Sequence, residues 1–76
     1  DATLLASMMI NARPLHRAHE RMIRSALGEN DLIVLFLQKP YREDIFNYEL
    51  RYKGLDHYVS NYLPKNRVLI VPFENT

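Results

Sequence analysis

The sequence predicts an α/β fold with the order strand, helix, strand, helix, strand, and three observations support this prediction. Short apolar runs occupy residues 3–10, 31–37 and 67–73. The two segments between these runs are longer and repeat their apolar residues at helical spacing. Connections of this length join parallel strands through right-handed crossovers. We therefore expect a parallel sheet with a ligand site outside the carboxyl ends of its strands.

The first strand is expected from Thr3 to Ile10, where Asn11 and Pro14 introduce a tight turn. A helix follows from about Leu15 to Leu27, because apolar residues recur there three and four positions apart. These residues are Leu15, Ala18, Met22, Ile23, Ala26 and Leu27. Gly28 is well placed to stop this helix, since glycine tolerates the left-handed conformation that follows many helices.

Residues 31–37 are rich in Ile, Val, Leu and Phe without alternation, which predicts a strand covered on both faces. Asp44 is the expected N-cap of the second helix, which Pro64 ends. One face of this helix repeats large side chains that we interpret as core: Tyr48, Tyr52, Leu55, Val59 and Tyr62. A last strand is expected over residues 67–73, bounded by Pro72.

Charge and composition exclude several function classes. The chain has 10 Lys and Arg residues against 9 Asp and Glu residues, and the basic residues are spread along it, so no nucleic-acid surface is predicted. It contains no cysteine, which excludes disulfides and thiolate metal sites and is compatible with the cytoplasm. No apolar run approaches the ~20 residues of a membrane span. A soluble cytoplasmic protein without a membrane partner is therefore expected.

The length of 76 residues predicts one small unit. A full doubly wound nucleotide-binding domain usually needs more than ~100 residues, so we interpret residues 1–76 as a fragment of a larger enzyme. Three strands without the rest of their sheet would leave an apolar edge and an apolar face exposed. Self-association is therefore also expected.

Two histidines mark the candidate site. His16 and His19 lie three residues apart, so they share one helix face, and they follow Pro14 at the predicted helix start. The first turn of a helix offers unpaired N–H groups and the positive end of the helix dipole, both of which favour phosphate. The two imidazoles would add donors directed at the same anion. This position therefore predicts a triphosphate site.

The stretch from Pro14 to Glu20, PLHRAHE, resembles the nucleotide-binding signature of ATP sulfurylases, the sulfate adenylyltransferases of the HxxH nucleotidylyltransferase superfamily. A second similarity begins at Arg51, in a helix that leads into residues 61–69, NYLPKNRVL. The resemblance implies a Rossmann-like (HUP-type) nucleotidylyltransferase domain. Residues 1–76 would be the N-terminal part of this nucleotide-binding catalytic domain.

The resemblance also implies an activity, the conversion of ATP and sulfate to adenylyl sulfate and pyrophosphate in sulfate assimilation, with Mg²⁺ bound to the nucleotide. His16 and His19 would be the catalytic residues and would hold the ATP phosphates. Asn11 and Arg13 would add to this phosphate-binding group. No residue is predicted to bind a metal directly, and the fragment alone is expected to be inactive.

Two more candidates and one departure concern the rest of the site. Lys39 and Arg51 are possible further phosphate ligands. ATP sulfurylases usually read Gln-Thr-Arg-Asn-Pro-Leu-His, and their Gln and Arg hold the sulfate, whereas Ile10 and Ala12 stand at those positions here. The acceptor therefore stays open: sulfate, another small anionic molecule, or none, if the domain is a non-catalytic nucleotide-binding remnant. The reaction direction and the oligomeric state also stay open.

Each candidate has a plainer interpretation. The two histidines could be an ordinary polar helix start, or with Glu20 a zinc site, although catalytic zinc needs three protein ligands and helical metalloproteases use HExxH. The tyrosines of the second helix could form an interaction surface. Arg51 could pair with a carboxylate, face the site or remain solvated.

Overall fold

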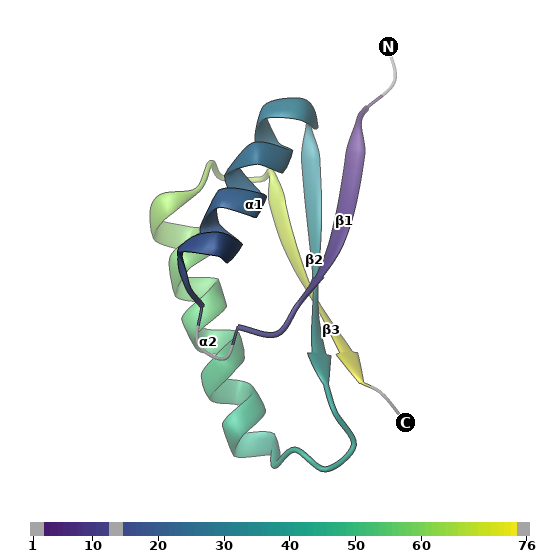
Figure 1. Cartoon of the computed structure of the whole chain (residues 1–76), viewed down its shortest axis with the longest axis vertical. Helices are drawn as coiled ribbons and strands as arrows, with labels where there is room; N and C mark the ends of the chain where they lie inside the picture. Colours follow the sequence, from purple (N-terminus) through teal and green to yellow (C-terminus); the bar gives the residue numbers. More distant parts are fainter. Residues whose placement is uncertain (1–2, 13–14, 75–76) are drawn as a thin grey trace.

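Three parallel strands and two helices make up the chain in the predicted alternating order (Figure 1). The computed structural model describes residues 3–12 and 15–74. Its elements are β1 (Leu5–Ile10), α1 (Arg17–Glu29), β2 (Leu32–Lys39), α2 (Ile45–Tyr62) and β3 (Val68–Glu74). The strands lie side by side in the order β1-β2-β3, and both neighbouring pairs are parallel. The predicted α/β class and element order are confirmed.

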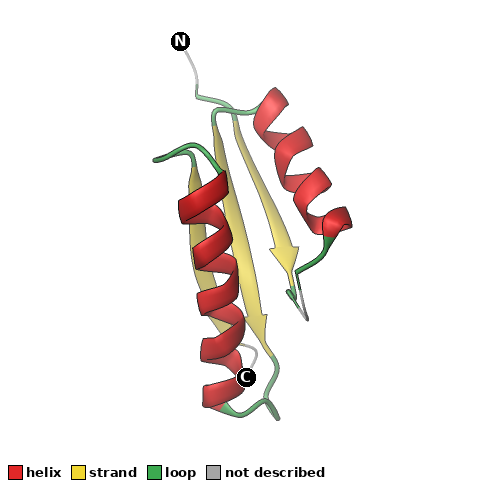
Figure 2. Cartoon of the chain, turned by 90° about the vertical axis from the view of Figure 1, so that its left-hand side faces the viewer, coloured by secondary structure: helices red, strands yellow, loops and turns green. Residues whose placement is uncertain are grey.

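Both helices cover the same face of the sheet, as Figure 2 shows with the helices in front of the strands. The reason is topological. The chain moves from β1 to β2 to β3 in one direction, and right-handed crossovers that move in one direction place their helices on one side. The prediction that residues 31–37 are covered on both faces is therefore wrong for the described part of the chain. Along β2 the side chains alternate between fully buried and half-buried.

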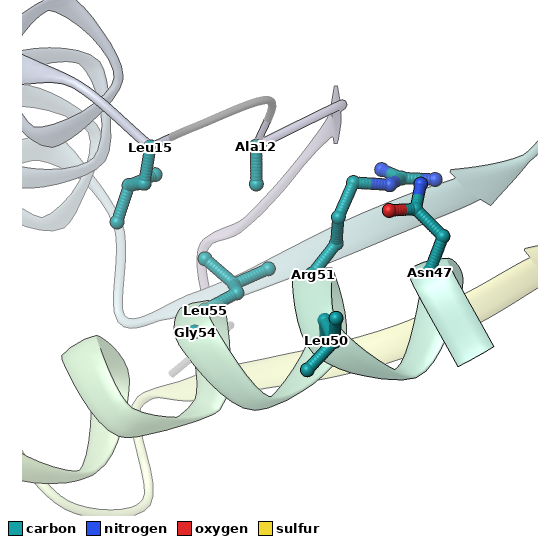
Figure 3. Close-up of a pocket in the computed structure, with 7 residues that line it drawn as sticks. All are labelled: Ala12, Leu15, Asn47, Leu50, Arg51, Gly54 and Leu55. Atoms are coloured by element: carbon teal, nitrogen blue, oxygen red, sulfur yellow. The ribbon is translucent and has the colours of Figure 1, made fainter.

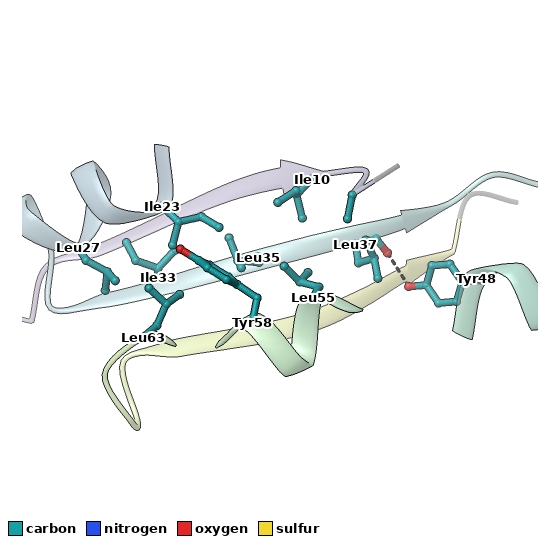
Figure 4. Close-up of a cluster of buried hydrophobic side chains, with 11 residues drawn as sticks. Ile10, Ile23, Leu27, Ile33, Leu35, Leu37, Tyr48, Leu55, Tyr58 and Leu63 are labelled. Atoms are coloured by element: carbon teal, nitrogen blue, oxygen red, sulfur yellow. Dashed lines mark hydrogen bonds between the residues drawn. The ribbon is translucent and has the colours of Figure 1, made fainter. Parts of the chain in front are cut away.

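The hydrophobic core lies between this face and the helices (Figure 4). Its centre is β2, whose Ile33, Leu35 and Leu37 are completely buried, and Ile23 of α1 and Leu55 of α2 pack there as well. The hydroxyl of Tyr48 donates a hydrogen bond of 2.6 Å to the Leu37 carbonyl. The core therefore holds both helices on the middle strand.

The end of α1 differs from the prediction. Gly28 does not stop the helix but lies inside it, without a positive φ, and α1 continues to Glu29. Side chains satisfy the free carbonyls at this end instead. The Asn30 amide donates to the Ala26 carbonyl at 3.0 Å, and the Arg67 guanidinium donates to the Leu27 and Asn30 carbonyls at 2.8 and 2.7 Å. A left-handed glycine is therefore not needed at this position.

Helix α2 begins after Asp44 as predicted, although the Asp44 side chain makes no capping hydrogen bond. The buried residues of this helix are Tyr48, Arg51, Leu55 and Tyr58. The predicted core stripe is therefore only partly right, because Tyr62 is 62% exposed while Tyr52 and Val59 are half-buried. The buried face of α2 includes the charged residue Arg51, which a search for apolar periodicity does not detect.

The face of the sheet that points away from the helices is open in the described chain. It carries exposed apolar side chains from the two outer strands, Leu5, Met9, Leu69 and Phe73. Phe36 of β2 meets Phe73 there edge to face, with ring centroids 6.4 Å apart. The expected self-association depends on this face and stays a prediction. Neither described helix is both long and apolar enough to cross a membrane.

Candidate functional site

The candidate site lies at the carboxyl ends of the strands, where β1 gives way to a short loop and then to α1 (Figure 1). His16 is the N-cap of α1 and His19 lies in its first turn. Since β1 is the outer strand of the described sheet, this loop lies beside the edge where a doubly wound sheet would reverse its strand order. Ligands of such folds bind at that point.

The two histidines cap the helix reciprocally. The His16 Nδ1 accepts a hydrogen bond from the Ala18 N–H at 3.2 Å, and the His19 Nδ1 accepts one from the His16 N–H at 3.3 Å. Their ring centroids lie 4.0 Å apart with 35° between the ring planes. This is the arrangement of a capping box, with imidazole nitrogens in place of the usual side-chain oxygens.

This cap determines where the imidazole protons lie. A nitrogen that accepts a hydrogen bond carries no proton, so each neutral ring must carry its proton on Nε2. Burial and the neighbouring His16 lower the pKa of His19 below its ordinary value, which favours its neutral form. The helix start therefore offers two Nε2–H donors beside the positive end of the α1 dipole.

The loop that leads to His16 adopts an unusual conformation. Ala12 has a φ of 52°, in the left-handed region that costs a non-glycine residue about 1–2 kcal/mol. Its side chain is nevertheless buried in the core. Asn11, a predicted phosphate ligand, is exposed beside it, whereas Arg13 lies outside the described residues. A conformation of this kind persists only when the surrounding structure holds it.

Arg51 supplies part of that support. Its Nε donates to the Glu43 Oε2 at 2.8 Å, one terminal nitrogen donates to the Asn11 carbonyl, and the other contacts the Gln38 carbonyl at 2.8 Å and the Glu43 Oε1. The ion pair with Glu43 is buried, with side-chain exposures of 7% for Arg51 and 4% for Glu43. Of the roles considered from the sequence, pairing with a carboxylate is the one observed.

Lys39, the other further candidate, lies at the end of β2 and forms an ion pair of 3.8 Å with Glu74 of β3. Its side chain is 14% exposed and lines a cavity together with Ile45, Tyr48 and Pro72. No contact between Lys39 and either histidine is present among the described residues. Its role as a phosphate ligand stays a prediction.

An open cavity of about 390 Å³ separates the loop before α1 from α2 (Figure 3). Ala12 and Leu15 line it from the loop, and Figure 3 shows Arg51 and Asn47 together at one end of its α2 wall. The remaining lining residues are Leu50, Gly54 and Leu55. Most of the wall is apolar, so the cavity resembles a gap in packing more than an anion site.

The two departures from the sulfurylase motif also have a structural meaning. Ile10 is 4% exposed and Ala12 is 6% exposed, and both belong to the hydrophobic core. Neither side chain has a polar atom, so neither can donate a hydrogen bond to sulfate. Polar recognition of an acceptor would have to come from other residues.

The structure gives no support to the zinc alternative. Among the described residues no three His, Asp or Glu side chains form a group that could hold a metal ion. In addition, the Nδ1 atoms of His16 and His19 already accept main-chain hydrogen bonds.

Sequence reasoning missed Glu43 and the hydroxyl of Tyr48. Glu43 stands in a polar loop before α2, where a carboxylate is usually solvated. The available signal was Arg51 itself, a charged residue at a core position of the helical repeat, three residues after Tyr48. A charge at such a position needs a partner, and the loop before the helix is the nearest source of one.

Comparisons with known proteins agree with the fold. The family model described as ATP-sulfurylase matches residues 3–76. A search of curated proteins found no significant match. Among solved structures, the chain is similar to a bifunctional NMN adenylyltransferase/ADP ribose pyrophosphatase from Francisella tularensis, complexed with AMP and a Mn ion. The TM-score is 0.77 at 16% identity, over 97% of this chain and 23% of that one. The Rossmann-like fold of nucleotidyltransferases is thereby confirmed.

Proposed function

Because the chain belongs to the ATP-sulfurylase family, we propose that it supplies the triphosphate-binding part of an enzyme that transfers the adenylyl group of MgATP. The observation that carries the proposal is the reciprocal histidine cap, which leaves two Nε2–H donors at the start of α1. The chain spans 23% of the similar adenylyltransferase structure. The activity is therefore proposed for a longer protein that contains this domain, not for these residues alone.

In the proposed reaction an acceptor oxygen attacks the α-phosphorus of ATP. The bond from that phosphorus to the oxygen bridging to the β-phosphate breaks, and pyrophosphate leaves with the electron pair. Negative charge grows on the leaving pyrophosphate, where His16 and His19 donate their Nε2–H groups. Catalysis of this kind depends on positioning and on charge stabilisation and needs no covalent enzyme intermediate.

Mg²⁺ would be held by the ATP phosphates and would supply additional charge neutralisation when bound. The contribution of this chain is different. The Nε2–H groups of the two imidazoles and the N-terminus of α1 orient the phosphates, because the cap already engages the Nδ1 atom of each ring.

Sulfate is the first candidate acceptor, because the family is that of ATP sulfurylases. A second candidate is another small anionic acceptor, and the buried apolar side chains of Ile10 and Ala12 favour it. An acceptor panel separates the two: sulfate, phosphorylated and carboxylated small molecules are supplied with MgATP, and pyrophosphate release is measured.

The decisive test substitutes both histidines by asparagine in the full-length protein. An Asn side-chain oxygen can accept the same capping hydrogen bonds, so His16→Asn with His19→Asn removes the Nε2–H donors and keeps the helix start. Losing one such donor typically lowers kcat about 10²–10³-fold, and we expect at least this loss. His57→Asn is the matched control, since His57 lies on the exposed side of α2 and contacts Asn61.

Pyrophosphate release that is unchanged in the double variant would contradict the proposed function. If no acceptor supports release, but MgATP still binds to the wild type and not to the double variant, the domain is a nucleotide-binding remnant.

A further inference from the structure

We propose that Arg51 is a positioning residue for the two histidines. Its guanidinium holds the Asn11 carbonyl, at the point where the loop before α1 leaves β1. This inference rests on the proposed function, in which His16 and His19 hold the ATP phosphates. It assigns Arg51 no contact with ATP. The residue acts through the backbone and thereby sets where the helix cap lies relative to the sheet.

The contacts of Arg51 join three segments at the carboxyl end of the sheet. Its guanidinium binds the carbonyl of Asn11, the first residue after β1, and that of Gln38 near the end of β2. Two contacts to Glu43 tie it to the loop before α2. We call this set of three acceptor residues and Arg51 the arginine clamp. One rigid planar group thus joins the end of β1, the end of β2 and that loop.

The position of the Asn11 carbonyl matters because the next residue is strained. Ala12 takes its positive φ directly after the clamped carbonyl, and four residues separate Asn11 from the N-cap His16. A strained residue relaxes when its neighbours are free to move. Releasing the Asn11 carbonyl would therefore let the loop shift, and the capping histidines would shift with it.

Arg51 is poorly suited to bind the nucleotide itself. The residue is 8% exposed, and the contacts to Glu43, Asn11 and Gln38 engage four of the five N–H groups that a guanidinium carries. The ring of Tyr48 also lies beside it, 5.2 Å from the guanidinium carbon to the ring centroid. A lysine at this position could donate to one or two of these acceptors but could not reproduce the planar fork.

The chain offers a matched control in Arg67. This residue also donates to main-chain carbonyls of three residues, Leu27, Asn30 and Asp31, at 2.7–3.0 Å. Those carbonyls belong to the end of α1 and the start of β2, so they lie at the amino end of the sheet. Arg67→Lys should therefore damage a similar set of hydrogen bonds without touching the loop before α1.

The experiment compares Arg51→Lys with Arg67→Lys in the full-length protein. The first readout is the ¹⁵N spectrum of the imidazoles of His16 and His19 without ligand. The second is the affinity for MgATP, with kcat and KM where an acceptor is known. Far-UV circular dichroism and thermal unfolding verify that both variants are folded at the assay temperature. If Arg51→Lys does not fold, Glu43→Gln replaces it, because the guanidinium then stays but its carboxylate partner is lost.

We expect Arg51→Lys to shift both imidazole spectra and to lower kcat/KM by up to about 10²-fold, the scale of a 1 Å misplacement of reacting groups. Arg67→Lys should leave the spectra unchanged and kcat/KM within about threefold, a change below 1 kcal/mol. Unshifted spectra in Arg51→Lys would overturn the proposal. Lost MgATP binding with unshifted spectra would show direct contact with the nucleotide and would overturn it as well.

The two proposals fail in different ways. If the double histidine variant transfers adenylyl groups as well as the wild type, the proposed function is wrong, and the imidazole spectra alone then decide whether Arg51 positions the histidines. If that variant is inactive while Arg51→Lys and Arg67→Lys behave alike, the proposed function is supported and the positioning role of Arg51 is wrong.

Discussion

At each end of the sheet one arginine binds several main-chain carbonyls. Comparing these two arginines distinguishes a residue that only stabilises the fold from one that also positions the candidate site. At the amino end, half-buried Arg67 binds carbonyls of three residues around the start of β2. At the carboxyl end, Arg51 binds two carbonyls and the buried carboxylate of Glu43. The residue types and the acceptors are similar, but the surroundings differ in burial and in charge.

This difference indicates that substitution of the arginine should destabilise the carboxyl end of the sheet more than the amino end. At the amino end Asp31 is exposed, so water can replace the donor that its carbonyl would lose. At the carboxyl end a buried carboxylate is paired with a cation, and the strained Ala12 follows a carbonyl that the same cation binds. Functional loops are commonly held in this way by a rigid scaffold.

The largest effect is expected from Arg51→Met. This variant removes the guanidinium from the buried Glu43 carboxylate, which still accepts a hydrogen bond of 2.6 Å from the Asn47 amide, and breaking a buried ion pair typically costs about 3–5 kcal/mol. Urea unfolding of the variant and the wild type gives the difference. A second variant, Arg51→Met with Glu43→Leu, should recover part of the loss because no charge is then buried. A loss below about 1 kcal/mol in the single variant would remove the distinction between the two ends.

Arg67→Met should cost less, about 1–2 kcal/mol, because its carbonyl acceptors are neutral and one of them belongs to the exposed Asp31. The same urea titration measures it. If Arg67→Met lowers the free energy of unfolding as much as Arg51→Met does, the two arginines contribute equally to stability. The expected difference between the two ends of the sheet is then wrong.

Tyr48→Phe probes the carboxyl end without touching a charge. It removes the hydroxyl that donates to the Leu37 carbonyl at 2.6 Å, and a buried hydrogen bond contributes about 1 kcal/mol. Burial also raises the pKa of Tyr48, in agreement with an enclosed hydroxyl. Tyr58→Phe is the comparison, because the Tyr58 hydroxyl accepts a longer bond of 3.4 Å from Arg24. Thermal unfolding should rank the Tyr48 variant as the less stable.

The smallest effect is a pH dependence at the helix cap. The pKa of His19 is lowered from 6.5 by burial and by His16, so the folded state binds fewer protons than the unfolded state. This contribution to stability is complete above pH 6.5 and is lost as the pH falls below that value. Thermal unfolding between pH 8 and pH 5 should show the decline. His19→Asn keeps the capping acceptor and should flatten the curve, and an unchanged slope would contradict the assignment.

Much of the fold could be predicted because the local signals agreed. Apolar runs, helical periodicity and the turn at Asn11 each indicated the same order of elements, and the length of the connections indicated a parallel sheet. Burial on two faces of β2 could not be predicted correctly, because a run such as residues 31–37 reads the same whether its second face is covered or open. The helix end at Glu29 was missed because Asn30 and the distant Arg67 donate hydrogen bonds to the Ala26 and Leu27 carbonyls of the helix.

The sequence predicted that both histidines lie at the start of a helix, but it did not predict the residues that support this helix start. The PLHRAHE motif located both histidines, but their reciprocal cap depends on which ring nitrogen faces each N–H, and the sequence does not contain that information. The partner of Arg51 could not be identified either. Its acceptors lie 8, 13 and 40 residues away. Two of them are main-chain carbonyls, which every residue has, so the residue type does not identify them.

Pro72 has a consequence for how this sheet can be extended. The hydrogen bond from the Ile33 N–H to the Arg67 carbonyl fixes the alternation of the parallel ladder, so that the N–H groups of residues 69, 71 and 73 point toward β2. The nitrogen of Pro72 therefore points outward and has no hydrogen to donate to an incoming strand. The outward positions of β1 are Leu5, Ser7 and Met9, all of which keep their N–H groups. A further strand, from a longer chain or from another molecule, is thus expected to add beside β1, so the sheet can grow in one direction.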